Sequence, residues 1–594
     1  MNYFFSIFLR DLNREKFYEI IETLEQFSGS IVEVEKSLIL GQSDTVEIVA
    51  SLLKMREFYP EMRFGFSQYP GLAKGLSRIA KFGEVLISEE VEQKLLDDFE
   101  ITSLGMLTIE GMSSQILVCR IDQPRGDLKF PKQIRKENRI SRAGQIDAME
   151  NLLSVSNAVL IVGPTGIGKT VFIDQLVERW QEQKEVLRTV CPPIIRRLSL
   201  EPIMELVEQL LEIEDVESIG EKQQAIERRL KELGIADIGT TYLAVLDFLG
   251  LSEEETILEK MDLKVRVDLV TTNIAEIIKR MSWNRPLVII VEDVENMDPS
   301  SVNFMQNLIL KLADENVYFI FSSALSQVNI SGIKEFELRE IEREDLINLV
   351  KNEINEEIKF AAATPLHIAQ FLRLYREERL DYFYKQYQGE AAIGGFNLPF
   401  HDFKTVVKRR VELLEEKKDF IYNLAIAGIK IIPDEFPVDK DNLGLFEYFV
   451  KRGFLRRFLN YYIFINPLLH NEIYDLIPDK KRRHQHLADY YSRLEGYEEL
   501  AAYHLQQAES YNKAIEYLIK SAQLVVGKGA YDSGINYYKK ALELCQQHRE
   551  LANLEILVAI NEGLADIYRA LDDEETALKY YKVVLDSYKE ILKE

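Results

Sequence analysis

The sequence predicts a multidomain protein with an α+β N-terminal domain, an α/β central domain built on a parallel sheet, and a helical C-terminal half that ends in an α-solenoid. Three observations lead to this fold class. The chain has 594 residues, too many for a single hydrophobic core. Almost continuously apolar runs alternate with helical segments in the middle of the chain, which is typical of buried parallel strands. Small residues and tyrosines recur at helical spacing near the C-terminus, which is typical of stacked helical hairpins.

Composition limits the classes of function. The formal net charge of −25 disfavours general binding to nucleic acid or to anionic lipid, so we expect neither as a partner. The cysteines, Cys119, Cys191 and Cys545, lie too far apart for a metal-ligand motif or a disulfide framework. No apolar run is long enough to cross a bilayer, and Arg10 and Asp11 interrupt the apolar start of the chain. We therefore expect a cytoplasmic protein with no membrane partner.

The first predicted domain covers residues 1–121. Short β-like runs alternate with amphipathic helical segments in this range. The expected strands are residues 3–9, 31–40, 63–66, 84–88 and 115–121, and the expected helices are residues 14–27 and 45–58. The range 122–138 follows, in which Pro124 and Pro131 stand among many basic residues. This composition predicts a solvated basic linker, although a docking or nucleotide-sensing segment would have the same composition.

The strongest chemical signal lies in the predicted α/β core, residues 139–340. An octapeptide fits the pattern G-x-x-x-x-G-K-[ST] of a phosphate-binding P-loop, and it stands between an expected strand at 158–162 and an expected helix at 171–180. We expect it to bind ATP or ADP together with Mg²⁺. Backbone N–H groups would surround the β-phosphate, Lys169 would contact the β- and γ-phosphates, and the Thr170 hydroxyl would ligate Mg²⁺. The predicted nucleotide-binding residues are Gly163, Pro164, Thr165, Gly166, Ile167, Gly168, Lys169 and Thr170.

A second element is needed to complete a metal site. The apolar run 287–291 ends in Glu292 and Asp293, at the strand edge where ligands of parallel sheets bind. Successive side chains of a strand point to opposite faces, so the two carboxylates should have different roles. We assign Mg²⁺ to Glu292 and the attacking water to Asp293, although the roles could be exchanged. Ser322 and Ser323, after a third expected strand, are candidates either for sensing the γ-phosphate or for capping a turn.

Beyond residue 340 the sequence is predicted to be almost entirely helical. We expect an all-α helical lid and winged-helix-like arm over residues 341–478, and helical repeats over residues 479–594. The repeats carry a pattern of small residues between tyrosines, which lets paired helices approach closely. It is found at Tyr511-x-x-Ala514-x-x-Tyr517, Tyr531-x-x-Gly534-x-x-Tyr537 and Glu574-x-x-Ala577-x-x-Tyr580. Such repeats are surfaces for a protein partner.

These motifs together resemble the signal-transduction ATPases with numerous domains, the STAND ATPases. The segment VEDVENMDPSS, which begins at Val291, is similar to their second acidic motif, and Arg139 to Gln145 is similar to the segment that precedes their P-loop. The last part of the chain is similar to tetratricopeptide repeats. The resemblance implies an ATP-bound assembled state, an ADP-bound closed state and slow hydrolysis. Two departures, Ala363 where the family has glycine and Ala324 where it often has arginine, put hydrolysis rather than binding in question.

The N-terminal domain resembles class III nucleotidyl cyclases over residues 72–121, where Arg78 matches a helix arginine of that family. Catalysis in the family requires two metal-binding aspartates. The first strand here reads Phe4-Phe5-Ser6-Ile7-Phe8 without an aspartate, and Gly41-Gln42 stands where the family has Gly-Asp. The resemblance therefore implies an inactive cyclase-like domain that serves dimerisation or ligand sensing, in the domain layout of soluble adenylyl cyclases.

The resulting hypothesis is a nucleotide-dependent switch that hydrolyses ATP slowly, and homo-oligomer formation remains open. Two alternatives remain. A transcription regulator would use the basic clusters at 408–410, 456–457 and 480–483, although such clusters are commonly solvated helix faces. An active nucleotidyl cyclase would need metal ligands that the N-terminal strands lack. Retention on DNA and production of cyclic nucleotide would distinguish these alternatives.

Overall fold

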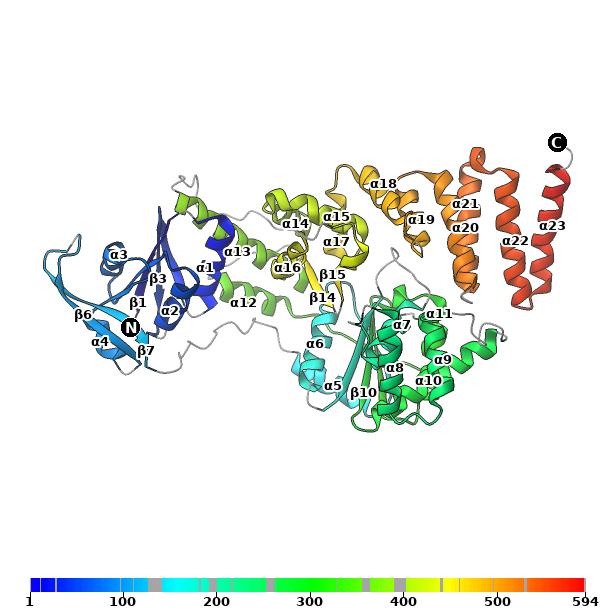
Figure 1. Ribbon diagram of the computed structural model, residues 1–594, viewed down its shortest axis with the longest axis horizontal. Coiled ribbons are helices and arrows are strands. Elements are labelled where there is room, and N and C mark those ends of the chain that lie inside the picture. Colours follow the sequence, from blue (N-terminus) through cyan, green and yellow to red (C-terminus); the bar gives the residue numbers. More distant parts are fainter. Residues whose placement is uncertain are drawn as a thin grey trace. The chain divides into compact units, whose positions relative to one another are not determined.

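The computed structural model divides the chain into two compact units (Figure 1). The first contains residues 1–141, 347–359 and 371–401, and the second contains residues 142–346, 360–370 and 402–594. The structure describes residues 2–591 apart from 11, 27–28, 47, 97, 111, 126–141, 181–182, 192–199, 215, 217, 253–260, 262, 327, 329, 355–363, 389–401, 439–441, 459, 495 and 528–530. Most of the predicted basic linker and Ala363 therefore lie outside the described residues. The range 341–478, expected to be one lid and arm, contributes to both units.

The first unit is built on a seven-stranded mixed sheet with the order β2-β3-β1-β4-β5-β7-β6. All neighbouring strands are antiparallel except β4 and β5. The strands are β1 (Tyr3–Phe8), β2 (Gly29–Glu35), β3 (Leu38–Ser43), β4 (Arg63–Ser67), β5 (Val85–Ser88), β6 (Phe99–Leu107) and β7 (Ile116–Pro124). The range 31–40, expected as β-like, is a hairpin of β2 and β3 that turns at Ser37 with φ of 63°. The prediction of an α+β N-terminal part agrees with this sheet and its helices.

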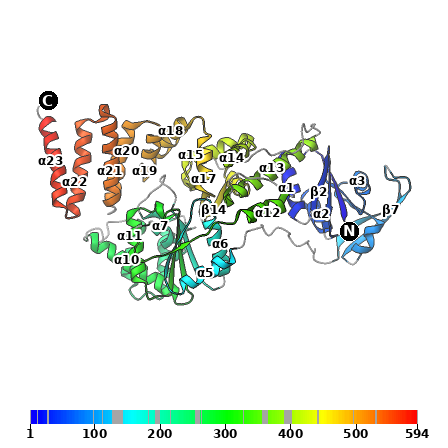
Figure 2. The ribbon, with the colours of Figure 1, turned by 180° about the vertical axis from the view of Figure 1, so that it is seen from behind.

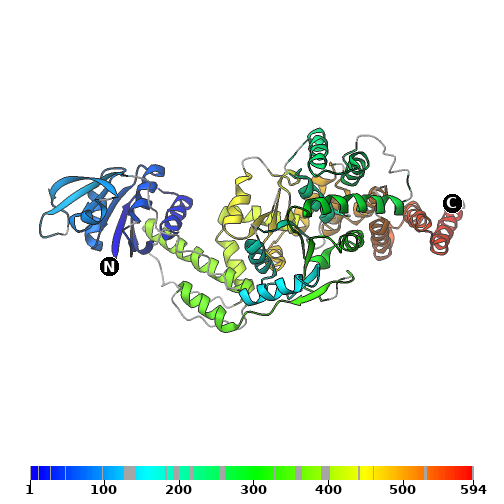
Figure 3. The ribbon, with the colours of Figure 1, turned by 90° about the horizontal axis from the view of Figure 1, so that it is seen from below.

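Helices cover both faces of this sheet. The apolar residues of α3 (Pro70–Ile79) pack on one face, while α1 (Arg14–Gln26), α2 (Ile48–Phe58) and α4 (Glu89–Leu95) pack on the other. Helix α13 (Pro365–Gln388) contributes Leu380 and Tyr387, both buried, to the core between the sheet and α1, α2 and α4. In the view from below, the yellow-green helix α13 lies beside the blue α1 (Figure 3). The core of the N-terminal strands thus includes residues far along the chain.

Polar contacts fix α13 to α1. Asp381 forms an ion pair with Arg14, and Arg379 pairs with Glu25 at 3.0 Å. The hydroxyl oxygen of Tyr387 accepts a hydrogen bond from the backbone N–H of Leu12 at 3.3 Å. Rings of both helices form one aromatic cluster made of Phe17, Tyr18, Tyr384 and Tyr387. This packing joins a segment that follows the predicted α/β core (residues 139–340) in sequence to the N-terminal sheet.

The second unit begins with a five-stranded parallel sheet in the order β12-β8-β11-β10-β9, as predicted for the central domain. The strands are β8 (Ala158–Val162), β9 (Glu185–Val190), β10 (Leu287–Glu292), β11 (Val317–Ser323) and β12 (Lys334–Glu337). Every residue of β10 is buried, because helices cover both faces. On one face lie α5 (Ala143–Leu153) and α6 (Lys169–Trp180), and on the other α7 (Glu201–Leu211), α8 (Ile219–Glu232), α9 (Ile238–Leu249), α10 (Leu263–Ser282) and α11 (Pro299–Lys311) form a larger helical layer.

The expected all-α arm is corrected by the structure, because a three-stranded antiparallel sheet lies within it. The strands are β13 (Lys430–Ile431), β14 (Leu455–Phe458) and β15 (Tyr461–Phe464), and the order is β13-β15-β14. Aromatic and β-branched residues dominate β15, which favours extended backbone over helix. The sheet packs with α14 (Phe403–Glu412), α15 (Lys418–Ala427), α16 (Gly444–Lys451) and α17 (Pro467–Asp475) around one core.

The remaining chain is helical, and its helices pack in sequence order, as the view from behind shows for α20 to α23 (Figure 2). They are α18 (Lys480–Tyr491), α19 (Glu498–Gln507), α20 (Tyr511–Gly527), α21 (Tyr531–Gln547), α22 (Leu554–Ala570) and α23 (Glu574–Ile591). Glycine allows α21 and α22 to approach closely, because a Cβ on Gly563 would lie 2.2 Å from the ring of Tyr538. Within the described part of the chain, no helix is both long and apolar enough to cross a membrane.

Candidate functional site

The P-loop stands where the sequence places it, between β8 and α6 of the second unit. Gly166 and Gly168 have φ values of 89° and 99°, which only glycine adopts without strain. A Cβ on Gly166 would also lie 3.4 Å from the Cβ of Leu366, near the start of α13. The loop therefore depends on two of the glycines of the motif for its backbone path, and the helix that follows it begins at Lys169.

Lys169 lies inside the loop. Its Nζ donates hydrogen bonds to the backbone oxygens of Gly163 at 2.7 Å and of Pro164 at 3.4 Å. Burial lowers the pKa of Lys169, and Asp293, Glu295 and Glu292 oppose that shift by attraction. The ammonium group is thus held by backbone carbonyl oxygens of the loop.

The two predicted metal ligands meet. The Thr170 hydroxyl donates to Glu292 Oε2 at 2.7 Å, and Glu292 is 3% exposed at the end of β10. The other carboxylate oxygen, Oε1, accepts from Arg188 Nε at 2.8 Å. A hydroxyl and a carboxylate oxygen side by side suit Mg²⁺, which prefers oxygen ligands and takes few from the protein when phosphates supply the rest. The residues present therefore fit the ion that the sequence predicts.

Asp293 lies next to this pair in a strained backbone conformation, with φ of 55°. Its backbone N–H donates to the Ser322 hydroxyl oxygen at 3.2 Å. Burial raises the pKa of Asp293 to about 7, helped by the charges of Glu292 and Glu295 and opposed by Lys169. A carboxyl group with a pKa near neutrality is suited to accept a proton from an attacking water.

Glu295 and the two serines complete the edge of the sheet. Glu295 was not identified from the sequence, and its Oε1 accepts the backbone N–H of Ala324 at 3.0 Å. Its position three residues after Glu292 is the signal that could have identified it. The Ser323 hydroxyl oxygen accepts from Leu325 N at 2.9 Å, as the turn-capping interpretation expects. The γ-phosphate-sensing role of Ser322 and Ser323 stays a prediction.

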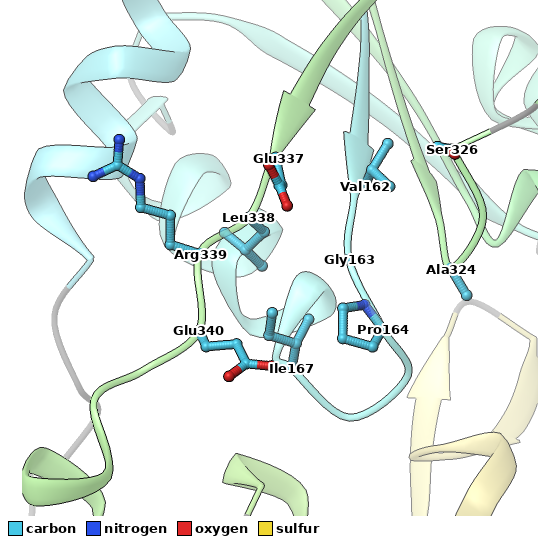
Figure 4. Close-up of a pocket in the computed structure, with 10 residues that line it drawn as sticks. All are labelled: Val162, Gly163, Pro164, Ile167, Ala324, Ser326, Glu337, Leu338, Arg339 and Glu340. Atoms are coloured by element: carbon cyan, nitrogen blue, oxygen red, sulfur yellow. The ribbon is translucent and has the colours of Figure 1, made fainter.

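A cavity of about 540 Å³ adjoins the P-loop (Figure 4). It lies between the ends of three strands and is lined by Val162, Gly163, Pro164, Ile167, Ala324, Ser326, Glu337, Leu338, Arg339 and Glu340. This volume is in the range of small-molecule sites. Arg142 supports its wall, because the buried guanidinium donates to the backbone oxygens of Ile167 at 2.8 Å and Arg339 at 2.7 Å. Of the sequence segment predicted to precede the P-loop, residues 139–141 lie outside the described residues.

In the first unit, the positions compared with the cyclase metal site and helix arginine do not come together in a site. Ser6 is buried in β1, and its hydroxyl is hydrogen-bonded to that of Ser77 at 2.9 Å. Gln42 lies in β3, opposite Phe4 of β1. Arg78 Nη2 lies 3.7 Å from Glu35 Oε2 at the surface. The described residues of the whole chain contain no group of three or more His, Cys, Asp or Glu side chains that could hold a metal ion.

Comparison with known families identifies the central domain. Residues 140–320 match the family model of the AAA ATPase domain. This range contains the P-loop, Glu292 and Asp293. No protein with a curated description matches the chain in sequence.

Comparison with solved structures gives matches with low sequence identity and low TM-score, three of which follow. A STAND protein with a tetratricopeptide repeat sensor from Pyrococcus horikoshii is 13% identical, with a TM-score of 0.36 over 77% of this chain and 65% of that protein. The adenylyl cyclase CyaB from P. aeruginosa is 15% identical, with a TM-score of 0.20 over 22% of this chain and 96% of the cyclase. An adenylate/guanylate cyclase/hydrolase from Silicibacter pomeroyi is 17% identical, with a TM-score of 0.19 over 20% of this chain and 95% of that one. The family match to residues 140–320 is the comparison on which the following proposal rests.

Proposed function

We propose that this protein is a cytoplasmic signal-transduction ATPase of the STAND type, which binds ATP or ADP with Mg²⁺, hydrolyses ATP slowly and uses the bound nucleotide as a switch. One observation carries the proposal. Lys169 and Thr170 of the P-loop, Glu292 and Asp293 gather at one edge of a parallel sheet, in a domain that matches the AAA ATPase family. Each of these residue types is what phosphoryl transfer to water requires at such an edge.

The residues divide the chemistry as follows. Thr170 and Glu292 would hold Mg²⁺, which would neutralise charge on the phosphate oxygens. Lys169 would exchange its bonds to Gly163 and Pro164 for bonds to phosphate oxygens. Asp293 would accept the proton of the attacking water, because it is the carboxylate next to the Thr170–Glu292 pair and burial raises its pKa. The cavity bounded by Leu338 and Arg339 would receive the rest of the nucleotide.

The other parts are assigned by the same proposal. The C-terminal helices would offer a surface to a protein partner, as stacked helical pairs do. The N-terminal domain would be an inactive cyclase-like fold used for dimerisation or ligand sensing, which Ser6 and Gln42 support because neither carries the negative charge of a metal-binding aspartate. Formation of a homo-oligomer would accompany the ATP-bound state.

The basic clusters do not favour the transcription-regulator alternative. In the cluster at 480–483, Lys480 pairs with Asp475, Lys481 with Glu509, and Arg482 and Arg483 both pair with Asp479. A lysine or arginine that is already paired with a carboxylate must give up that pairing to bind a DNA phosphate, so its net gain in binding free energy is small. We therefore retain the switch as the proposed function.

Purified full-length protein tests the proposal. Binding of fluorescent ATP, release of phosphate and particle size would be measured with Mg²⁺ for the wild type, Lys169→Ala and Asp293→Asn, with Lys311→Ala on the distant α11 as the control. We expect the wild type and Lys311→Ala to bind ATP, to turn over slowly and to change assembly state. Lys169→Ala should lose binding, and Asp293→Asn should bind while turnover falls by roughly 100-fold or more. A wild type without affinity for ATP or ADP would refute the proposal.

A further inference from the structure

A strand of the arm places the guanidinium group of Arg456 close to Glu292, the predicted Mg²⁺ ligand. Arg456 lies in β14, with Nη2 3.8 Å from Glu292 Oε1 and Nη1 3.9 Å from Asp174 Oδ1. Arg188 of β9 contacts the same two carboxylates, with Nη2 2.6 Å from Glu292 Oε1 and Nη1 2.7 Å from Asp174 Oδ1. Two guanidinium groups therefore face two carboxylates, one of which is the predicted metal ligand.

The two oxygens of Glu292 are divided between these neighbours. Oε2 accepts the hydroxyl of Thr170, whereas Oε1 faces Arg188 and Arg456. Arg456 thus leaves the position beside Thr170 open, but its charge reduces the negative potential of the carboxylate as a whole. Because Glu292 is almost completely buried, this charge is poorly screened by solvent.

The arm reaches this place through contacts that do not involve Arg456. Lys430 of β13 is 2% exposed, and its Nζ lies 2.8 Å from Glu201 Oε1 on α7 and also contacts Glu205. Val190, the last residue of β9, is buried among the apolar residues of the arm. These contacts hold β14 beside the ATPase sheet, so removal of the Arg456 side chain alone should weaken docking of the arm without releasing it.

We propose that Arg456 is a positioning residue through which the docked arm weakens the binding of Mg²⁺ at Thr170 and Glu292. Arg188 belongs to the ATPase sheet and stays beside Glu292 whether or not the arm is docked. Arg456 belongs to the arm and moves away from Glu292 when the arm undocks. An ion of two positive charges at Glu292 then weakens arm docking by the same factor as arm docking weakens binding of the ion. The inference rests on the proposed function, since it assigns regulation to the same nucleotide site.

The neighbouring arginine supplies a matched control. Arg457 follows Arg456 in β14, so its side chain points to the opposite face of the strand. Its side chain is 66% exposed, and Nη1 lies 3.6 Å from Glu447 within the arm. Substitution of either residue by alanine removes one charge and one long side chain from the same strand, but only Arg456→Ala changes the surroundings of Glu292.

The test compares full-length wild type, Arg456→Ala and Arg457→Ala. Affinity for a fluorescent ATP analogue would be titrated once with Mg²⁺ and once with EDTA. We expect Arg456→Ala to bind the Mg²⁺ complex at least tenfold more tightly while its affinity in EDTA changes less than twofold, and Arg457→Ala to match the wild type in both. Equal effects of the two substitutions, or weaker Mg²⁺-dependent binding by Arg456→Ala, would overturn the inference. Absence of ATP binding in the wild type would instead refute the proposed function, and this inference with it.

Hydrogen exchange gives a second readout that needs no nucleotide. Amide exchange of β14 and β15 would be measured for Arg456→Ala, Glu292→Gln and the double variant. If the arm arginine and the carboxylate interact, the two single changes should speed exchange at β14 and the double change should add little to either one. Independent, additive effects would overturn the inference even if the nucleotide data agreed with it.

Discussion

Loss of the Lys430 side chain should loosen the contact between the arm and the ATPase core. Burial alone lowers the pKa of Lys430, but the attraction of Glu201 and Glu205 outweighs it and the net shift is upward. Each glutamate side chain is only 14% exposed, and Glu205 also accepts a hydrogen bond from Thr189 at 2.6 Å. Lys430→Met leaves two carboxylates facing each other without a cation.

The magnitude follows from this burial. Removal of one partner from a buried ion pair costs roughly 3–5 kcal/mol, which corresponds to a factor of roughly 150 to 5,000 in the opening equilibrium of the contact. Lys430, Glu201 and Glu205 together carry one excess negative charge. Burial raises the pKa of Glu205, and the charge of Glu201 adds to this shift. Glu205→Gln keeps the hydrogen-bonding shape and leaves one cation with one anion, so we expect a change within about 1 kcal/mol.

Hydrogen exchange of the full-length protein measures this effect locally. A melting temperature would not, because a multidomain chain does not unfold in one transition. Peptides that contain β13 and α7 should lose protection by roughly two to almost four orders of magnitude in Lys430→Met and stay close to wild type in Glu205→Gln, with α22 as an internal reference. Equal protection of β13 in the two variants would refute the electrostatic reasoning.

Two further predictions concern the C-terminal helices. Gly563→Ala should destabilise α22 by roughly 1–3 kcal/mol through the clash with Tyr538, whereas Gly144→Ala in α5, where nothing lies within 4 Å of the added Cβ, should be neutral or stabilising by up to about 1 kcal/mol. Hydrogen exchange of peptides from α22 and from α5 tests both, and equal effects would contradict the reasoning. The buried His484 and His504 place their Nδ1 atoms 2.8 Å apart in a hydrogen bond, which requires one of these two nitrogens to be unprotonated. Burial lowers the pKa of His484 to about 4 and holds the pKa of His504 well below its usual value. Since both folded pKa values lie below the unfolded value near 6.5, stability is full above that pH and falls as the pH drops, and His484 alone contributes a loss of about 1.4 kcal/mol at pH 5.5. Exchange at α18 and α19 should therefore accelerate between pH 7.5 and 5.5 after correction for the intrinsic rate, and His484→Gln should reduce the effect; no acceleration would contradict this prediction.

The core of the nucleotide site could be predicted because its signals are local. The P-loop is one continuous motif, and Glu292 ends a short, β-branched apolar run that is typical of a buried strand. That the Thr170 hydroxyl would meet Glu292 followed from the rule that parallel strands present ligands at one edge. Residue type and order along the chain were sufficient for these inferences.

The arginines around Glu292 could not be predicted in the same way. Arg188 lies within β9, whose polar residues Glu185 and Arg188 hide the apolar pattern of a buried strand. Arg456 and Lys430 are distant in sequence from Glu292 and Glu201, and no local rule pairs them. The basic pair at 456–457 was noted as a cluster, but only the strand direction shows that its two members face different surroundings.

The boundary of the N-terminal domain also depends on long-range packing. The sequence interpretation ended this domain at residue 121, where its last expected strand closes. The periodicity of α1 predicts that one face of this helix is buried. It does not show whether residues 1–121 are sufficient to bury that face or whether a later segment is needed. The structure supplies the partner in Leu380 and Tyr387 of α13.

That packing has a consequence for biosynthesis. The ribosome completes the strands up to β7 long before it reaches α13, and at roughly 5–20 residues per second the delay is on the order of tens of seconds. During that time the face of α1 that holds Phe17 has no helix over it, although Phe17 is fully buried in the finished protein. The nascent N-terminal domain would therefore present an aromatic surface suited to chaperones, and it would reach its final form only after the ATPase core has been synthesised.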